Sequence, residues 1–216
     1  MIVPRSVQTM AREGLKYVVP MGAVTAVCLI AFGSHPLTYI AAILAFAFVL
    51  FFRLPAAPAL VGDGAVLSPA GGFVIEVVPE QEPVFLKSLS QRISIFMTPL
   101  DVHVNTAPFS GDVKYAEYKR GTFFKADRPE ARLQNERMSI GIERPDGIKC
   151  LATQVAGWLA RRIICDVKPG DVVTRGARYG MIEFGSRMDI HLPHAARVLV
   201  RAGQHVRTAR TVLAEI

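Results

Sequence analysis

The sequence predicts a mainly β protein of the α+β class, with a helical hairpin at its N-terminus. Residues 17–52 contain no Asp, Glu, Lys or Arg and consist mostly of apolar side chains. From Val61 onward the apolar residues form short runs separated by glycine and proline, which is typical of strands joined by turns. Helix signals in this second part are weak. These observations divide the chain into a membrane hairpin over residues 1–53 and a β domain over residues 54–216.

The composition of the 216-residue chain excludes a disordered protein and favours contact with lipid. Hydrophobic residues make up 51% of it, charged residues make up 20%, and the mean hydropathy is +0.31. A net charge of +7 suits an anionic partner but does not identify one. Cys28, Cys150 and Cys165 form no CxxC pair, so they indicate neither a disulfide framework nor a redox motif, and we expect a reducing compartment or an inert role for them.

The N-terminal apolar run is expected to form two helices. A Gly-Ser-His-Pro sequence at residues 33–36 interrupts it, and Pro36 disfavours helix at His35. Each apolar arm reaches roughly 24 Å, against roughly 30 Å for a bilayer core, so two tight spans and a re-entrant hairpin both fit. By the positive-inside rule, the flanking basic residues place both ends of the hairpin, and the β domain, in the cytoplasm. These residues are Arg5, Arg12, Lys16 and Arg53.

The β domain is expected to resemble a barrel-sandwich fold. Polar glycine turns precede apolar segments at residues 61–66, 167–173 and 202–206. Such turns recur in folds of the biotinyl and lipoyl type, where glycine adopts positive φ in tight hairpins, although plain hairpin turns are the simpler explanation. The expected strands are 65–67, 73–78, 93–96, 111–118, 138–143, 149–156, 163–167, 179–183, 188–192 and 197–200.

Two segments carry residues that could perform chemistry. Asp101, His103 and Asn105 alternate, so an extended chain would place them on one face. Histidine is the usual proton carrier near neutral pH, and a carboxylate can orient it, although a structural role for His103 is equally compatible with the sequence. Gly185 and Ser186 lie between two expected strands, where the simplest interpretation is a turn.

Together these segments resemble the short, membrane-associated form of phosphatidylserine decarboxylase, a pyruvoyl-dependent lipid enzyme. The resemblance covers nearly the whole chain, in order and in spacing. Its motifs are the apolar hairpin ending in Phe51, Phe52 and Arg53; Leu67, Ser68, Pro69 and Ala70; the Leu-Asp-Val-His-Val-Asn sequence at 100–105 with Pro108 and Gly111; Asn135, Glu136 and Arg137; the Gln-Val-Ala-Gly sequence at 154–157 with Arg161 and Arg162; and Phe184, Gly185, Ser186 and Arg187 with Asp189.

The resemblance implies a proenzyme that cuts itself between Gly185 and Ser186. Attack of the Ser186 hydroxyl on the Gly185 carbonyl would give an ester, and β-elimination would then break the chain. The products would be a β chain, residues 1–185, and an α chain, residues 186–216. The α chain would begin with a pyruvoyl group derived from Ser186, so that no external cofactor is needed.

The resemblance also implies the reaction and its partners. The pyruvoyl ketone would form a Schiff base with phosphatidylserine at the membrane and accept electrons as CO2 departs, which leaves phosphatidylethanolamine. His103 would supply a proton, with Asp101 as its orienting carboxylate or as a base in self-cleavage. Arg161, Arg162 and Arg187 would bind the lipid phosphate or carboxylate. The two chains would stay associated, and a homodimer is expected.

The sequence departs from the family at Gly71, where an aspartate associated with self-cleavage is usual. Either Asp101 substitutes for it, or the chain is a degenerate, non-cleaving homologue that acts as a membrane-anchored barrel-sandwich adaptor. No biotin- or lipoate-type lysine motif is present. The basic residues are too scattered to predict nucleic-acid binding, and no ligand cluster predicts a metal.

Overall fold

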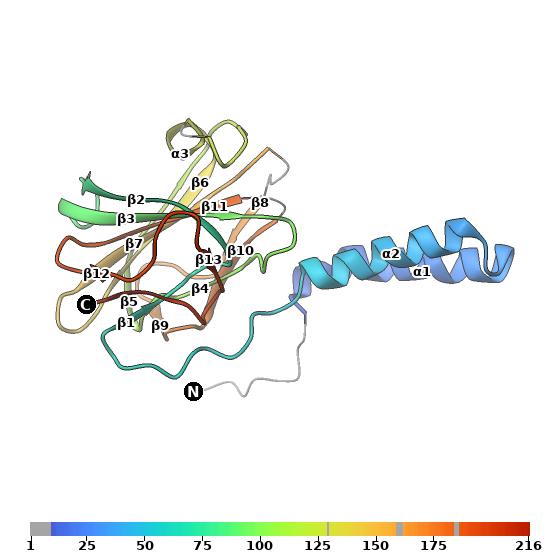
Figure 1. Cartoon of the computed structure of the whole chain (residues 1–216), viewed down its shortest axis with the longest axis horizontal. Coiled ribbons are helices and arrows are strands. Elements are labelled where there is room, and N and C mark those ends of the chain that lie inside the picture. The colour runs from blue at the N-terminus through green and yellow to red at the C-terminus, as the bar shows by residue number, and fades with distance from the viewer. Residues whose placement is uncertain (1–9, 129, 159–161, 184–185) are drawn as a thin grey trace. The chain divides into compact units, whose positions relative to one another are not determined.

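The computed structural model describes residues 10–128, 130–158, 162–183 and 186–216. It confirms the predicted fold class, because the chain after the hairpin is built mainly of strands (Figure 1). The chain falls into two compact units, of which the first ends at Leu54 and the second spans Pro55–Ile216.

The first unit is a pair of antiparallel helices, α1 (Leu15–Phe32) and α2 (Pro36–Phe51), preceded by the short 3₁₀ helix η1 (Arg12–Gly14). Helix α1 ends where Gly33 adopts a φ of 59°, and α2 begins at Pro36, whose fixed φ suits the first turn. The Tyr17 ring stacks on Phe48 with ring centroids 5.3 Å apart, joining the two helices near their open ends. In the described part of the chain, Arg12–Phe32 is the one helix long and apolar enough to cross a membrane, and α2 is a shorter apolar helix.

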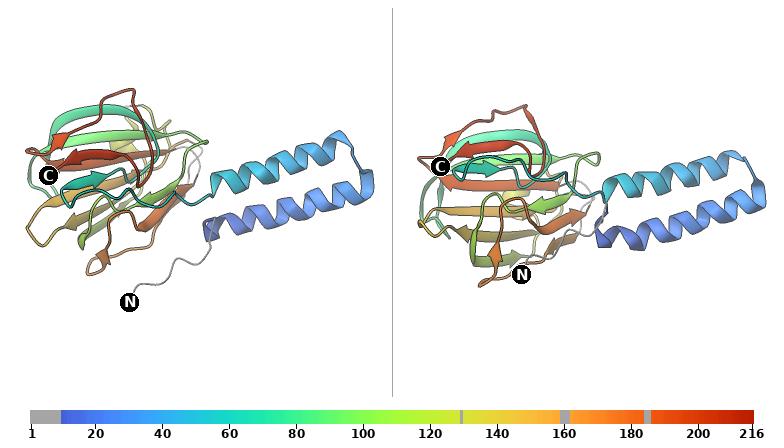
Figure 2. Two further views of the ribbon diagram at one scale, coloured as in Figure 1. Left: turned by 60° about the horizontal axis from the view of Figure 1, so that its bottom comes forward. Right: turned by 90° about the horizontal axis from the view of Figure 1, so that it is seen from below.

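The second unit consists of strands with one short helix, and Figure 2 shows its sheets from two further directions. The elements are β1 (Ala65–Leu67), β2 (Gly72–Glu82), β3 (Ser88–Met97), β4 (Val104–Thr106), β5 (Gly111–Lys119), α3 (Ala131–Gln134), β6 (Arg137–Glu143), β7 (Lys149–Val155), β8 (Arg162–Cys165), β9 (Val172–Val173), β10 (Arg178–Glu183), β11 (Ser186–Pro193), β12 (Arg197–Val198), β13 (His205–Val206) and β14 (Val212–Glu215).

Within the described ranges these strands form three sheets. The large sheet has the order β13-β2-β3-β11-β7-β6-β5-β9, and the two small sheets have the orders β4-β10-β8 and β1-β14-β12. The core lies between one face of the large sheet and the two small sheets, which contribute residues such as Tyr179 and Leu213. Successive side chains of a strand point to opposite faces, so the large sheet has an apolar core face and a polar outer face.

Strand β11 shows this division clearly. Met188, Ile190 and Leu192 are fully buried in the core, whereas Arg187, Asp189 and His191 alternate with them on the outer face. The strand pairs with β3 on one side and with β7 on the other. The residues at its beginning are therefore held by two neighbouring strands.

Candidate active site

Ser186 is the first residue of β11 and is completely buried. It pairs with Met97 at the end of β3, and its Oγ donates to the Met97 Sδ over 3.1 Å. Sulfur is a weak acceptor, so the hydroxyl is only weakly held. Gly185, the other residue of the expected cleavage site, lies outside the described residues.

His103 lies in the segment that connects β3 to β4 and is also completely buried. Its Nδ1 is 2.9 Å from the backbone carbonyl oxygen of Asp101. Because a carbonyl can only accept a hydrogen bond, this contact assigns the proton of the neutral imidazole to Nδ1. Nε2 is then the basic nitrogen, which suits proton transfer.

The Asp101 carboxylate faces His205 rather than His103. One oxygen accepts from the backbone N–H and hydroxyl of Thr98 at 2.9 and 2.7 Å, and the other lies 2.8 Å from the His205 Nε2. The expected carboxylate contact to His103 is therefore replaced by the contact to the Asp101 carbonyl. Sequence reasoning missed His205 because no local motif connects it to a residue so far away along the chain.

Of the three arginines expected to bind substrate, the two that the structure describes, Arg162 and Arg187, lie in different sheets. Arg187 is buried on the outer face of the large sheet, where its Nε donates to Asp189 at 2.7 Å and its Nη2 donates to Ser94 at 2.9 Å. Since neighbouring residues of a strand point to opposite faces, its guanidinium lies on the other side of the sheet from the Ser186 hydroxyl. Arg162 is exposed at the start of β8, opposite Glu183 of β10, and Arg161 lies outside the described residues.

Gly71 lies beside the buried hydroxyl of Thr208. A Cβ atom at Gly71 would be 3.2 Å from the Thr208 Oγ1 and 3.6 Å from the Val102 backbone nitrogen. The Thr208 Oγ1 is buried, and no described residue hydrogen-bonds to it. A side chain at position 71 would therefore begin in contact with this hydroxyl.

Two buried amides, Asn105 of β4 and Gln154 of β7, connect the small sheet to the core face of the large sheet. The Gln154 Nε2 donates to the Asn105 Oδ1 at 2.8 Å and to the Ile164 carbonyl at 3.2 Å. Asn105, which the sequence places on one face with His103, thus contacts a second buried polar side chain, Gln154. Sequence reasoning recognised Gln154 only as part of a motif.

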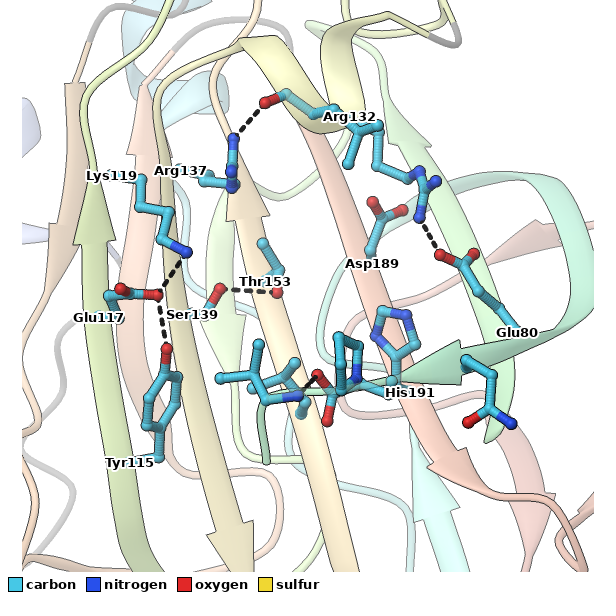
Figure 3. Close-up of a pocket in the computed structure, with 16 residues that line it drawn as sticks. Glu80, Tyr115, Glu117, Lys119, Arg132, Arg137, Ser139, Thr153, Asp189 and His191 are labelled. Atoms are coloured by element: carbon cyan, nitrogen blue, oxygen red, sulfur yellow. Dashed lines mark hydrogen bonds and ion pairs between the residues drawn. The ribbon is translucent and has the colours of Figure 1, made fainter. Parts of the chain in front are cut away.

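A separate pocket of about 180 Å³ lies on the outer face of the large sheet (Figure 3). Four of its charged side chains form two pairs: Arg132 donates to Glu80, and Lys119 lies 2.9 Å from Glu117. His191 is 8% exposed there, and burial is the main reason that its pKa is lowered. Among the described residues, no group of three or more His, Cys, Asp and Glu side chains is arranged to hold a metal ion.

Comparison with known proteins gives a consistent result. Residues 44–214 match the family described as phosphatidylserine decarboxylase. Three relatives are named phosphatidylserine decarboxylase proenzyme. The protein of Salinibacter ruber is 44% identical over 79% of this chain and 76% of its own length. The protein of Mycolicibacterium vanbaalenii is 42% identical over 100% of this chain and 92% of its own length. The protein of Carboxydothermus hydrogenoformans is 41% identical over 96% of this chain and 96% of its own length.

These matches confirm the resemblance seen in the sequence. The family match begins within helix α2, at residue 44, and covers nearly all of the β domain, including Ser186 and His103. The relatives match this chain over most of their own lengths as well. The chain is therefore a member of the phosphatidylserine decarboxylase family of enzymes.

Proposed function

We propose that the chain is a proenzyme that cuts itself between Gly185 and Ser186 and then converts phosphatidylserine to phosphatidylethanolamine and CO2. The observation that carries the proposal is the burial of Ser186 at the head of β11, in a chain of this family. The Ser186 hydroxyl attacks the Gly185 carbonyl, and the resulting ester breaks by β-elimination. Water then enters and ammonia leaves, so that the α chain begins with a pyruvoyl group.

The surroundings of Ser186 suit this group. A ketone is small and uncharged, and it needs no hydrogen-bond acceptor. The Ser186 hydroxyl would give up only a weak contact to sulfur, and the core residues Met97 and Met188 would cover an apolar methyl group. When formed, the pyruvoyl group supplies an electron sink for decarboxylation.

His103 is the proposed proton carrier. Its Nδ1 is held by the Asp101 carbonyl, so its Nε2 can take a proton and later deliver it to the carbon that loses CO2. Asp101 acts as a positioning residue through that carbonyl, while its carboxylate fixes the turn by bonding to Thr98 and His205. Arg161 and Arg162 remain candidates for the lipid phosphate. Arg187 is not part of the proposed binding site, because its hydrogen bonds to Asp189 and Ser94 hold its guanidinium on the opposite face of the sheet.

The cut chains are expected to stay together. After cleavage β11 belongs to the α chain, yet it lies between β3 and β7 of the β chain and pairs with both. Strand β14 of the α chain likewise pairs with β1. Separation would break these ladders and expose core residues such as Ile190.

We place this enzyme at the cell membrane, with the β domain on the cytoplasmic face. The apolar hairpin and its basic flanks support this placement, and a net charge of +7 favours a bilayer that contains anionic lipid. Association into a homodimer is part of the proposal, and its support is the family resemblance.

Intact mass spectrometry tests the proposal directly. Under denaturing conditions the purified protein should give two species, one of residues 1–185 and one of residues 186–216 that carries a pyruvoyl terminus. Under native conditions the two should be found in one complex, and a Ser186→Ala variant should remain whole. A wild-type chain that stays uncut would contradict the proposal and favour a membrane-anchored adaptor.

A further inference from the structure

The amide pair of Asn105 and Gln154 leaves one hydrogen-bond donor and one acceptor unused. Both residues are completely buried. Within the described residues, neither the Asn105 Nδ2 nor the Gln154 Oε1 has a hydrogen-bond partner. A buried polar atom without a partner costs free energy, so such a pair is a candidate site for a ligand that supplies the missing partners.

The two amides contact each other, and Gln154 lies near Ser186. Each unused atom belongs to an amide that takes part in the 2.8 Å bond between Gln154 and Asn105. Gln154 pairs with Met188, and Ser186 lies two residues before Met188 on the same face of β11. Diagonal neighbours of this kind are roughly 7–8 Å apart. The pair therefore lies on the Ser186 face of the sheet, within reach of a small group bound there.

We propose that in the mature enzyme this amide pair binds the amino acid part of the lipid headgroup, with Asn105 donating to its carboxylate and Gln154 accepting from its ammonium group. This inference rests on the proposed function. An α-amino acid carries both groups on one carbon, so a neighbouring donor and acceptor match it. The pair also lies near Ser186, the residue that would carry the pyruvoyl group.

Neutral amides suit a decarboxylase better than charged side chains would. A fixed positive charge on the carboxylate would stabilise the substrate more than the transition state, in which that negative charge is leaving. An amide N–H orients the carboxylate without this penalty. The buried arginine nearest in sequence to Ser186, Arg187, is bound to Asp189 on the other face and does not compete for the carboxylate.

The test uses two lipids that each keep one half of the headgroup. Phosphatidylethanolamine has the amine without the carboxylate, and phosphatidyl-3-hydroxypropionate has the carboxylate without the amine. Equilibrium binding of each lipid, presented in nanodiscs, is measured for the cut full-length enzyme and for its Asn105→Leu and Gln154→Met variants. The KM and kcat for phosphatidylserine are measured in parallel.

The variants should affect different lipids. Asn105→Leu should weaken the binding of phosphatidyl-3-hydroxypropionate by about tenfold or more, as expected for the loss of a hydrogen bond to a charged group. The affinity for phosphatidylethanolamine should change by no more than about twofold. Gln154→Met should weaken the binding of phosphatidylethanolamine and leave the binding of phosphatidyl-3-hydroxypropionate nearly unchanged. Both should raise the KM for phosphatidylserine. If Gln154→Met does not fold, the selective pattern of Asn105→Leu decides the matter alone.

A matched control is Asn135→Ser. The Asn135 amide is buried, but its Nδ2 donates to the Phe124 and Ala156 carbonyls and its Oδ1 accepts from the Phe124 N–H. This variant should lower the thermal stability without separating the two lipids.

Equal losses for both lipids in the test variants, or none, would overturn the headgroup assignment and leave a water-binding or purely structural pair. A wild-type chain that stays uncut contradicts the proposed function instead, and its mass shows this before any lipid is added.

Discussion

At the scale of single residues, the unusual position is Gly71, where the family resemblance leads one to expect an aspartate. The structure gives this departure a physical setting, because the buried Thr208 hydroxyl beside Gly71 has no partner within the described residues. Asp101 does not fill that space with its carboxylate, which is bonded to Thr98 and His205. A carboxylate is thus missing from a place that offers it a donor.

We expect Gly71→Asp to accelerate self-cleavage. Its carboxylate would reach the Thr208 hydroxyl and add a positioned acid–base group, which typically contributes about 10²-fold or more. A hydroxyl shift of a few tenths of an ångström accommodates the new Cβ. The measurement is the fraction of cut chain against time by intact mass. Gly71→Asn has the same shape without the charge and should not accelerate the reaction; if it does so equally, the carboxylate is not the cause.

At the scale of elements, β11 combines a core face with a polar face, and its ends were harder to predict than its centre. The apolar alternation predicts residues 188–192, and the strand extends over Ser186–Pro193. Its added length comes from pairing with β3 and β7. Strands of two or three residues, such as β4, β9 and β13, are too short to show a period, so tertiary pairing alone defines them.

The polar face of β11 should make the stability of the fold depend on pH. Burial lowers the pKa of His191, partly offset by Asp189, Glu80 and Glu82, so the unfolded chain takes up a proton that the folded chain resists. Stability is then fully present above the unfolded pKa of about 6.5 and falls as the pH drops below it, by at most about 1.4 kcal/mol per pH unit for one proton.

Urea unfolding of the full chain in detergent between pH 7.5 and 5.5 measures this slope. His191→Gln should flatten it. His194→Gln, which changes an exposed imidazole close in sequence, is the matched control. An unchanged slope in His191→Gln would show that another group is responsible.

At the scale of the whole molecule, the chain consists of an apolar helical unit and a β unit that contains every described site residue. The exposed side chains of α1 and α2 include many large apolar groups, such as Ile30 at 86% and Ile43 at 67% exposure. Such surfaces need lipid or a partner to cover them. In the proposed membrane enzyme, we therefore expect the hairpin to carry the main affinity for the bilayer.

A chain that begins at Pro55 should no longer float with lipid vesicles in high salt, whereas the full chain should do so. Salt does not weaken membrane binding by hydrophobic insertion. It does weaken the electrostatic attraction between a basic domain and anionic lipid, because it screens the charges. Flotation on vesicles with and without phosphatidylserine, at low and high salt, measures both contributions. Flotation of the shortened chain in high salt would place a second hydrophobic anchor in the β unit.

The sequence by itself determined the fold class, the helical hairpin and most of the longer strands, because these depend on local apolar patterns. It also supplied the family, through motifs in a fixed order. Only the tertiary structure decided which polar groups meet: Asp101 with His205, Gln154 with Asn105, and Arg187 with Asp189 on the far face. The first two contacts join residues far apart in the chain, and the third depends on which face of β11 is buried. Local patterns do not encode such pairings, because they arise when the sheets pack.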